Sequence, residues 1–141
     1  MTKTYLALAL LITVLAGNAY GEAEVYYCAE TDSNGFNYDE KLKEYSRSRF
    51  RTNQFKMKLD RASNRIELAV DSKHEVLRKQ KYACIIPYPQ IPDILSCHEL
   101  DGSYFFNFNI DNGRFARIIG SGYVFSDGDS LAVAYGKCDK F

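Results

Sequence analysis

Alternation of apolar and polar residues with a period of two most constrains what this chain can fold into. Apolar residues occupy every second position over 55–59 and again over 66–70, and the polar segment Arg-Ala-Ser-Asn at 61–64 separates the two runs. Because successive side chains of a strand point to opposite faces, these runs predict two half-buried strands joined as a hairpin. Similar patterns predict a strand at 24–31 that turns back at Asn34-Gly35, a strand from Tyr82 into Pro87, a hairpin over 104–119, and a last strand at Leu131–Tyr135.

The turn of the hairpin over 104–119 decides the orientation of one arginine. A two-residue turn at Asn112-Gly113 would place Arg117 on the same face as Phe106 and Phe108. A buried guanidinium there would need a carboxylate partner. A bulged three-residue loop would instead shift the register and turn Arg117 outward. We expect the bulged loop.

One segment carries a helical spacing. Tyr38, Leu42 and Tyr45 fall at i, i+4 and i+7, and two acidic residues, Asp39 and Glu40, stand near the front. Apolar residues at this spacing share one face of a helix, and acids near the first turn favour its start. The segment is therefore a candidate for two or three helical turns in a chain that is otherwise mostly β.

The first 21 residues predict a secretory signal peptide. Lys3 precedes an apolar run of about 12 residues, and small residues at Gly17, Ala19 and Gly21 stand where a signal peptidase could cut. The run is shorter than the roughly 20 residues of a membrane-spanning helix, and we expect no transmembrane segment after cleavage. Residues 22–141 then form a single exported domain with one modest core.

The chain has four cysteines, all of them in the mature part. An even number of cysteines in an exported chain predicts disulfides, and four allow three pairings. The segment between Cys84 and Cys97 contains three prolines and must turn, so we expect these two to pair. Cys28 and Cys138 would then join the two ends of the mature chain. A zinc site would need short spacings such as Cys-x2-Cys, which the sequence lacks.

Composition and charge exclude some classes of function. Hydrophobic residues make up 46% and charged residues 26%, as in ordinary globular domains, and the formal net charge is zero. A neutral chain is not built mainly on charge attraction to nucleic acid. The densest basic segment, Arg47-Ser48-Arg49-Phe50-Arg51, could serve RNA, a membrane or an acidic protein. We expect a solvated face there, with the neighbouring aromatic residues in the core rather than stacked on bases.

We expect no catalytic, cofactor-binding or metal-ligating residue. His74 and His98 belong to no metal-binding motif, and the chain has no serine nucleophile elbow and no phosphate-binding glycine motif. An EF-hand alignment on Gly35 fails at Lys41, where a bidentate glutamate is required. The acidic segment 126–130 has the composition of an ordinary turn.

The layout at the two ends of the mature chain resembles a known family. Tyr26-Tyr27-Cys28 follows the leader, and Cys138 lies three residues from the end. This resembles the small secreted ribonuclease-like effectors of powdery mildew fungi, which carry Tyr-x-Cys and a matching terminal cysteine at these places. The resemblance implies the α+β fold of fungal guanyl-specific ribonucleases, in which one short helix packs on a twisted antiparallel sheet. Residues 38–45 would be that helix, and 104–119 the central hairpin.

The same resemblance implies a scaffold without catalysis. The active family uses a glutamate base, a histidine acid and an arginine for the phosphate, and proton transfer to and from the ribose fails without them. The chain carries other residue types at the three matching positions, namely Cys84 or Ile85, Gly120 or Ser121, and Ser103 or Tyr104.

The resulting hypothesis is a secreted fungal effector, not an enzyme, that acts in or beside a plant host cell by binding a host protein or RNA. Two alternatives stay open. The first is an exported inhibitor of a hydrolase on an all-β barrel or sandwich. The second is a small nuclease or hydrolase whose catalytic groups converge only in space. A closed barrel without a helix would favour the inhibitor.

Overall fold

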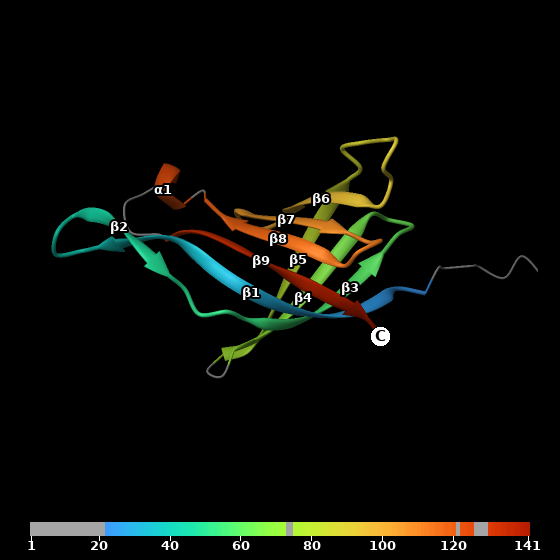
Figure 1. The fold of residues 1–141 in the computed structure, drawn as a ribbon, viewed down its shortest axis with the longest axis horizontal. Coiled ribbons are helices and arrows are strands. Elements are labelled where there is room, and N and C mark those ends of the chain that lie inside the picture. Colours follow the sequence, from blue (N-terminus) through green and yellow to red (C-terminus); the bar gives the residue numbers. More distant parts are fainter. Residues whose placement is uncertain (1–21, 73–74, 121, 126–129) are drawn as a thin grey trace, which may run out of the picture.

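The computed structural model describes residues 22–72, 75–120, 122–125 and 130–141. The predicted signal peptide, His74 and most of the acidic segment 126–130 lie outside these described residues. Within them the chain is almost entirely extended and contains one four-residue helix (Figure 1). The elements are β1 (Glu24–Asp39), β2 (Glu44–Arg49), β3 (Gln54–Asp60), β4 (Arg65–Ser72), β5 (Glu75–Ile85), β6 (Ile94–Glu99), β7 (Tyr104–Asn109), β8 (Arg114–Ile119), α1 (Gly122–Phe125) and β9 (Leu131–Lys140).

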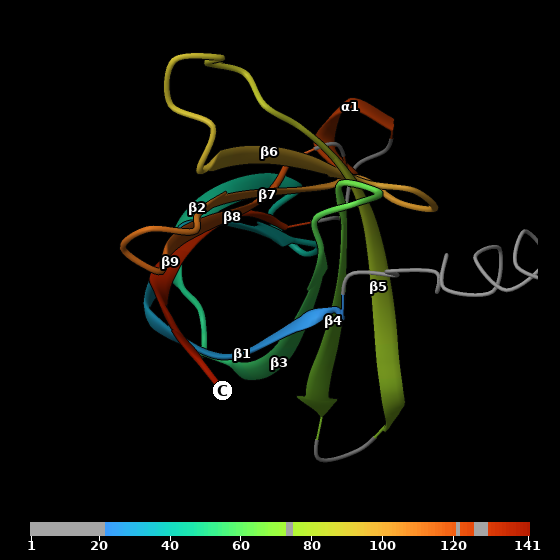
Figure 2. The same cartoon turned by 90° about the vertical axis from the view of Figure 1, so that its right-hand side faces the viewer.

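The strands form a closed antiparallel barrel, seen as a ring in Figure 2. Each strand from β3 to β9 pairs with the next, and β1 closes the ring by pairing with both β3 and β9. The register of β1 against β9 shifts between Glu30 and Asp32, and such a bulge lets a long strand bend. Beyond the bulge, residues 34–39 leave β3 and pair with β2 instead. The eight strands β1 and β3–β9 thus make the barrel, and β2 extends its wall on one side.

The core of the barrel is made of inward-facing aromatic and aliphatic side chains. Phe115 lies at its centre, stacked on Phe106 and edge-on to Phe55, each with 5.3 Å between ring centroids. A chain without tryptophan fills the interior of an eight-stranded barrel with phenylalanine and tyrosine instead. The period-two predictions are confirmed for β1, β3, β4, β5, β7 and β8, where the buried positions are those of the predicted runs: Tyr26, Phe55, Met57, Leu59, Ile66, Leu68, Tyr82, Phe106, Phe108 and Phe115. The strand β6 with its buried Leu95 was not predicted. In β9 the expected inner face is wrong, because Ala132 and Ala134 are buried while Val133 and Tyr135 face solvent.

The predicted α+β fold, with a helix packed on a ribonuclease-like sheet, is wrong. The structure has instead the all-β barrel that was the stated alternative. Residues 38–45 are not helical: Tyr38 pairs with Tyr45 across the β1–β2 hairpin. The described helix, α1, has four residues and contacts this hairpin through the Tyr45 and Tyr123 rings, 5.3 Å apart. No described helix is long and apolar enough to cross a membrane.

The acidic residues that suggested a helix start belong to a hairpin turn. The carboxylate of Asp39 accepts hydrogen bonds from the backbone N–H groups of Lys41 and Leu42, as an N-cap residue would. The backbone C=O of Asp39 accepts from the N–H of Lys43, which has a left-handed φ of 56°. The chain therefore reverses after one turn instead of continuing as a helix.

Two further hairpins repeat this four-residue loop. Asp60 accepts from the N–H groups two and three residues ahead, and Asn109 does the same. The fourth loop residues, Asn64 and Gly113, have left-handed φ angles of 50° and 70°. An Asp or Asn before the loop and a positive φ at its fourth position therefore form one recurrent motif. Asn64 and Gly113 tolerate that φ, whereas the loop after Asp39 has Lys43 there.

The predicted turn at Asn34-Gly35 is wrong as well, because β1 continues through it. Gly35 faces residue Ala132 of β9, where a Cβ would collide with the Leu131 carbonyl. This glycine therefore permits a close approach of two strands and does not make a turn.

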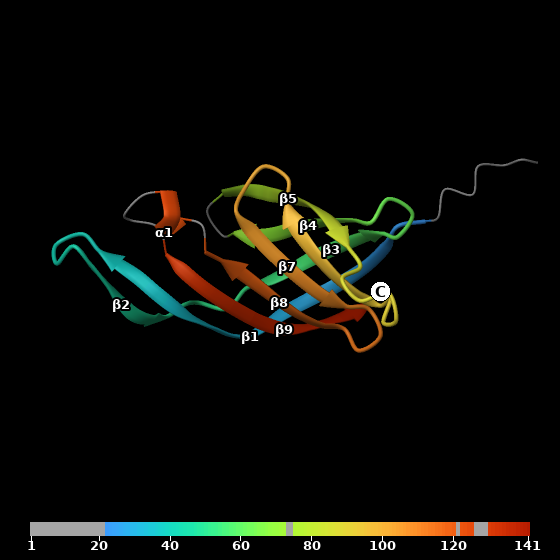
Figure 3. The same cartoon turned by 90° about the horizontal axis from the view of Figure 1, so that it is seen from above.

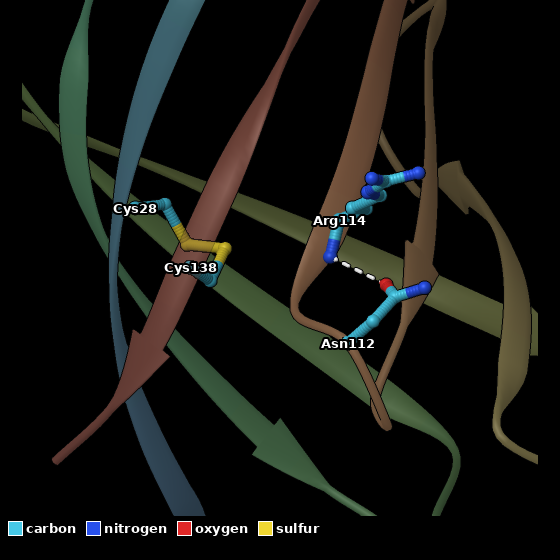
Figure 4. The surroundings of a disulfide bond; sticks show 4 residues. All are labelled: Cys28, Asn112, Arg114 and Cys138. Atoms are coloured by element: carbon cyan, nitrogen blue, oxygen red, sulfur yellow. Dashed lines mark hydrogen bonds between the residues drawn. A yellow bond between two sulfur atoms is a disulfide. The ribbon is translucent and has the colours of Figure 1, made fainter.

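The register of β7 and β8 overturns the expected bulged loop. Phe106 pairs with Arg117 and Phe108 with Phe115, which leaves a four-residue loop at 110–113. At the turn the side chain of Asn112 accepts a hydrogen bond of 2.9 Å from the Arg114 N–H, as Figure 4 shows. An even-numbered loop keeps Arg117 on the inner face, where its side chain is only 12% exposed.

Both expected disulfides are present. Cys28 and Cys138 are direct partners on β1 and β9, and their bond lies inside the strand pair that closes the ring (Figure 4). Cys84 and Cys97 are direct partners on β5 and β6. In the chain-entropy model a loop of this second size contributes about 3 kcal/mol and the first a little under ~5 kcal/mol.

Candidate functional site

The segment between β5 and β6 is the candidate site, hereafter the β5–β6 loop (residues 86–93, Ile-Pro-Tyr-Pro-Gln-Ile-Pro-Asp). It projects from the barrel in Figure 1 and Figure 2. Its apolar side chains are turned to solvent: Tyr88 is 52% and Ile91 46% exposed, and Ile85 and Ile86 beside them are exposed as well. Large apolar side chains gathered at one exposed place mark a site of contact with another molecule.

Prolines fold this loop into two successive β-turns. The N–H of Ile91 donates to the C=O of Tyr88 at 2.8 Å, and the N–H of Ile94 donates to the C=O of Ile91 at 3.2 Å. Pro89 and Pro92 each occupy the second position of these turns, where a fixed φ near −65° is favourable. The loop therefore has few alternative conformations to lose on binding.

The base of the loop is held from three sides. Cys84 and Cys97 form a disulfide across it. The N–H of Ile110 in the β7–β8 loop donates to the C=O of Asp93 at 2.9 Å. The guanidinium of Arg61 lies 3.9 Å from the Asp93 carboxylate. These contacts fix the loop to its neighbours on both sides.

Arg61 is itself held by a small charged network at the end of the barrel. Its Nε lies 3.1 Å from Glu24, and the amine of Lys140 lies 3.2 Å from the same carboxylate. Burial alone would raise the pKa of Glu24, but the hydrogen bonds from Tyr26 and Lys140 and the two nearby cations lower it below its ordinary value. Burial and the hydrogen bond to Glu24 raise the pKa of Tyr26 to about 12. The network links the two ends of the domain to the base of the loop.

An uncharged outer face continues from the loop across the barrel. It consists of two rows of register partners on β5 to β9, and its exposed large apolar members are Ile85, Phe105, Val133 and Tyr135. The ring of His98 is exposed and lies edge-on to the ring of Phe105, with 5.1 Å between the ring centroids. The rows are Ala83, His98, Phe105, Ile118 and Val133, and Ile85, Ser96, Asn107, Ala116 and Tyr135.

A buried ion pair lies inside the barrel below the β1–β2 hairpin. The side chain of Glu30 is fully buried, and its Oε1 lies 3.4 Å from the guanidinium of Arg117. Its Oε2 accepts from the backbone N–H of Asn53 at 2.8 Å. The missing carboxylate partner of an inward Arg117 is therefore Glu30, which comes from a strand far away in the sequence.

A second buried carboxylate has different surroundings. Glu99 ends β6 on the inner face, and its Oε2 has no hydrogen-bond partner among the described residues. It lies against Gly102, where a Cβ would collide with the carboxylate. No described histidine is paired with it, so it has no partner for acid-base chemistry among these residues.

The structure spreads the other predicted positions over the barrel. Cys84 forms a disulfide with Cys97, and Tyr104 starts β7. The basic segment lies on β2 and just after it, at the surface. Among the described residues no group of three or more histidine, cysteine, aspartate or glutamate side chains could hold a metal ion.

Comparison with known proteins adds no family, since neither a family model nor a curated protein matches the chain. The class that the fold defines is a disulfide-bonded antiparallel β-barrel with a side-chain core and a projecting apolar loop.

Sequence reasoning located this loop but not its role. The three prolines between Cys84 and Cys97 predicted a turn, and the isoleucines and tyrosine between them were not singled out. An available signal was the repeat Tyr-Pro-Gln-Ile and Ile-Pro-Asp-Ile, because proline followed by a polar residue favours a turn and leaves neighbouring side chains exposed.

Proposed function

We propose that this chain is an exported, non-catalytic binding protein that inhibits a hydrolase by inserting the β5–β6 loop into an apolar cleft of the enzyme. The observation that carries the proposal is the exposed apolar tip of a loop closed by a disulfide and shaped by prolines. A loop with little conformational freedom loses little entropy on binding, so more of its contact energy becomes affinity.

The fold supports the inhibitor over the other sequence hypotheses. A closed barrel without a helix is the arrangement that favoured an exported inhibitor, and the described residues form a closed barrel with one helix of four residues. The two disulfides suit the oxidising environment that a cleaved signal peptide would lead to. The resemblance to mildew effectors would place the target in a plant host, so secreted plant hydrolases are the first candidates for the target.

The outer face beside the loop gives the proposal a second contact area. Ile85 belongs both to the end of β5 and to the uncharged rows, so an enzyme that holds Tyr88 and Ile91 would also meet this face. Protein interfaces combine an apolar centre with a polar rim, and Lys81, Arg114 and Lys137 around these rows are exposed and charged.

The test is an inhibition assay with the oxidised protein, residues 22–141, against a panel of secreted plant proteases and glycosidases. The loop variant is Tyr88→Ser with Ile91→Ser. The matched control is Leu42→Ser at the tip of the β1–β2 hairpin, which is 67% exposed and apolar as well. Removing two central apolar contacts should weaken inhibition about 30-fold or more, since hot-spot side chains contribute about 2 kcal/mol or more.

Three results would overturn the proposal. The first is that no enzyme of the panel is inhibited, and the second is that the loop variant inhibits as well as the control. The third is catalysis by the protein itself, measured as cleavage of RNA or of a panel substrate when no other enzyme is added. Both variants should fold, because the exchanged side chains are already exposed. Circular dichroism checks this.

A further inference from the structure

The strand β2 presents an open edge of the sheet along its whole length. In the part of the chain that the structure describes, each of the eight barrel strands is paired on both sides over at least part of its length, and the first part of β5 pairs with β4 alone. β2 is paired on one side only, with β1, and it ends the order of strands (Figure 1 and Figure 3). An open edge offers unpaired N–H and C=O groups to another extended chain.

The register decides which backbone groups of β2 face the open side. The N–H of Phe50 donates to the C=O of Ser33 at 2.8 Å, so the backbone N–H and C=O groups of Phe50 face β1. In an antiparallel ladder the direction of these backbone groups alternates from residue to residue, and those of Ser48 therefore also face β1. The backbone N–H and C=O groups of Arg47 and Arg49 face the open edge instead.

The side chains of these two residues give the edge a positive charge. Arg47 and Arg49 lie two positions apart, so they share one face of the strand, and both are exposed. The Nε of Arg49 lies 2.9 Å from Asp32, which leaves its terminal nitrogens open to a second carboxylate. Arg47 has no ion pair within 4 Å among the described residues.

Charge argues against a second copy of this chain at the edge. Two β2 strands related by a two-fold axis at Arg47 would set Arg47 against Arg47, and an axis at Ser48 would set Arg47 against Arg49. Like charges directly opposite each other in a strand pair are destabilising. A segment with carboxylates at alternate positions would instead place an acid opposite each arginine.

We propose that β2 accepts an extended acidic segment of a partner protein as an added antiparallel strand, with carboxylates opposite Arg47 and Arg49. The backbone groups of the edge provide the hydrogen bonds, and the two arginines select the sequence. This site is independent of the β5–β6 loop and of the proposed inhibition. It makes the arginines of the predicted basic segment a recognition surface for an acidic protein segment.

The experiment uses the oxidised protein and a synthetic peptide, Thr-Val-Glu-Val-Glu-Val-Thr, with a matched peptide that has lysine in place of both glutamates. Binding is followed by NMR, together with hydrogen exchange of the backbone amides. We expect the acidic peptide to bind with a Kd below about 1 mM and the lysine peptide at least tenfold more weakly. The exchange of the Arg47 and Arg49 amides should slow, while that of the Ser48 amide, already paired with β1, should not change.

Two variants separate the backbone from the charge. Arg47→Pro removes an N–H that faces the open edge and should abolish binding without loss of the β1–β2 pairing. Arg47→Glu keeps the N–H and should reverse the preference between the two peptides. Lys58→Glu on β3, also exposed, is the control and should change nothing.

Several outcomes would overturn the proposal. These are no binding of the acidic peptide at about 1 mM, equal binding of both peptides, or binding without protection of the Arg47 and Arg49 amides. A dimer that forms through β2 would assign the edge to a second copy instead. If Arg47→Pro perturbs folding, Arg47→Glu still tests the proposal, because that variant should bind the lysine peptide better than the acidic one.

Discussion

The β1–β2 hairpin and the β5–β6 loop both project from the barrel, but different chemistry closes their bases (Figure 1). The base of the hairpin is closed without a covalent bond: the N–H of Glu30 donates to the C=O of Asn53, and the Glu30 carboxylate accepts from the Asn53 N–H and pairs with Arg117. The base of the loop is closed by Cys84 and Cys97. The first closure depends on charge and hydrogen bonds, and the second on a covalent bond that persists under oxidising conditions.

The tips of the β1–β2 hairpin and of the β5–β6 loop differ in polarity. The hairpin ends in the sequence Asp-Glu-Lys-Leu-Lys-Glu at 39–44, which is nearly all charged. The loop tip carries Tyr88 and Ile91 in solvent between prolines. A charged tip is soluble by itself, whereas an apolar tip on a rigid base is stabilised further when a partner covers it. This difference is the basis for proposing apolar contact at the loop and backbone pairing with charge at the hairpin.

The largest effect is expected at the closure of the hairpin. Glu30→Ala should lower the free energy of unfolding by about 3–5 kcal/mol, because it leaves Arg117 buried without its partner. Glu30→Met combined with Arg117→Met should cost less than Glu30→Ala alone. Urea denaturation measures both, with Asp32→Ala at the exposed pair with Arg49 as a control near 0–1 kcal/mol. A loss below about 1 kcal/mol for Glu30→Ala would show that the Glu30–Arg117 pair does not stabilise the base of the hairpin.

The closure of the loop is expected to be the next in size. Replacing Cys84 and Cys97 with alanine should lower the free energy of unfolding by about 3 kcal/mol, because the unfolded chain regains its freedom. Inhibition of the target should weaken as well, while peptide binding at β2 should stay unchanged. Equal loss of both activities would mean that the two projections are not independent.

The turn residues should show effects of opposite sign. Pro89→Ala and Pro92→Ala should each cost about 0.4–1 kcal/mol through the unfolded chain. Lys43→Gly should stabilise by about 0.5–1 kcal/mol, because its left-handed φ of 56° strains a side chain. Asn64→Gly at the equivalent place of the β3–β4 loop is the matched control and should gain less, since Asn tolerates that conformation. A lower free energy of unfolding in Lys43→Gly would contradict the claim that the backbone of Lys43 is strained.

The smallest effect is expected on acidification. Hydrogen bonds from the Asn34 side chain and the Ser33 N–H, with the nearby Arg49 cation, hold the pKa of Asp32 below its ordinary value near 3.8. The folded pKa is the lower one, so this stabilisation is present above pH 3.8 and is lost as the pH falls through the folded value. The protection factors of the β2 amides, which are corrected for the pH dependence of intrinsic exchange, should therefore fall below pH 3.8, and less so in Asp32→Asn. An equal fall of the protection factors in the β5–β6 loop would show general unfolding instead.

Features set by neighbouring residues were predictable from the sequence, whereas features set by residues distant in the chain were not. Runs such as Phe55, Met57 and Leu59 predicted their strands, because side-chain alternation is local. The segment from Asp39 was ambiguous, because an acidic residue caps a helix start and a four-residue hairpin loop with the same hydrogen bonds. Arg117 could not be oriented, because its carboxylate partner, Glu30, comes from the other end of the chain.

The amino-acid sequence by itself determined most of the strands, many of the buried residues and the Cys84–Cys97 pair, but not β2 and β6. These follow from period-two alternation and from the prolines between Cys84 and Cys97, and Cys28–Cys138 was expected only as the remaining pair. Only the tertiary structure decided that the sheet closes, that β2 keeps an open edge, and that Tyr88 and Ile91 stay in solvent. The physical reason is that pairing of β1 with β9 joins residues 110 positions apart at Cys28 and Cys138, and no local pattern encodes such a partner.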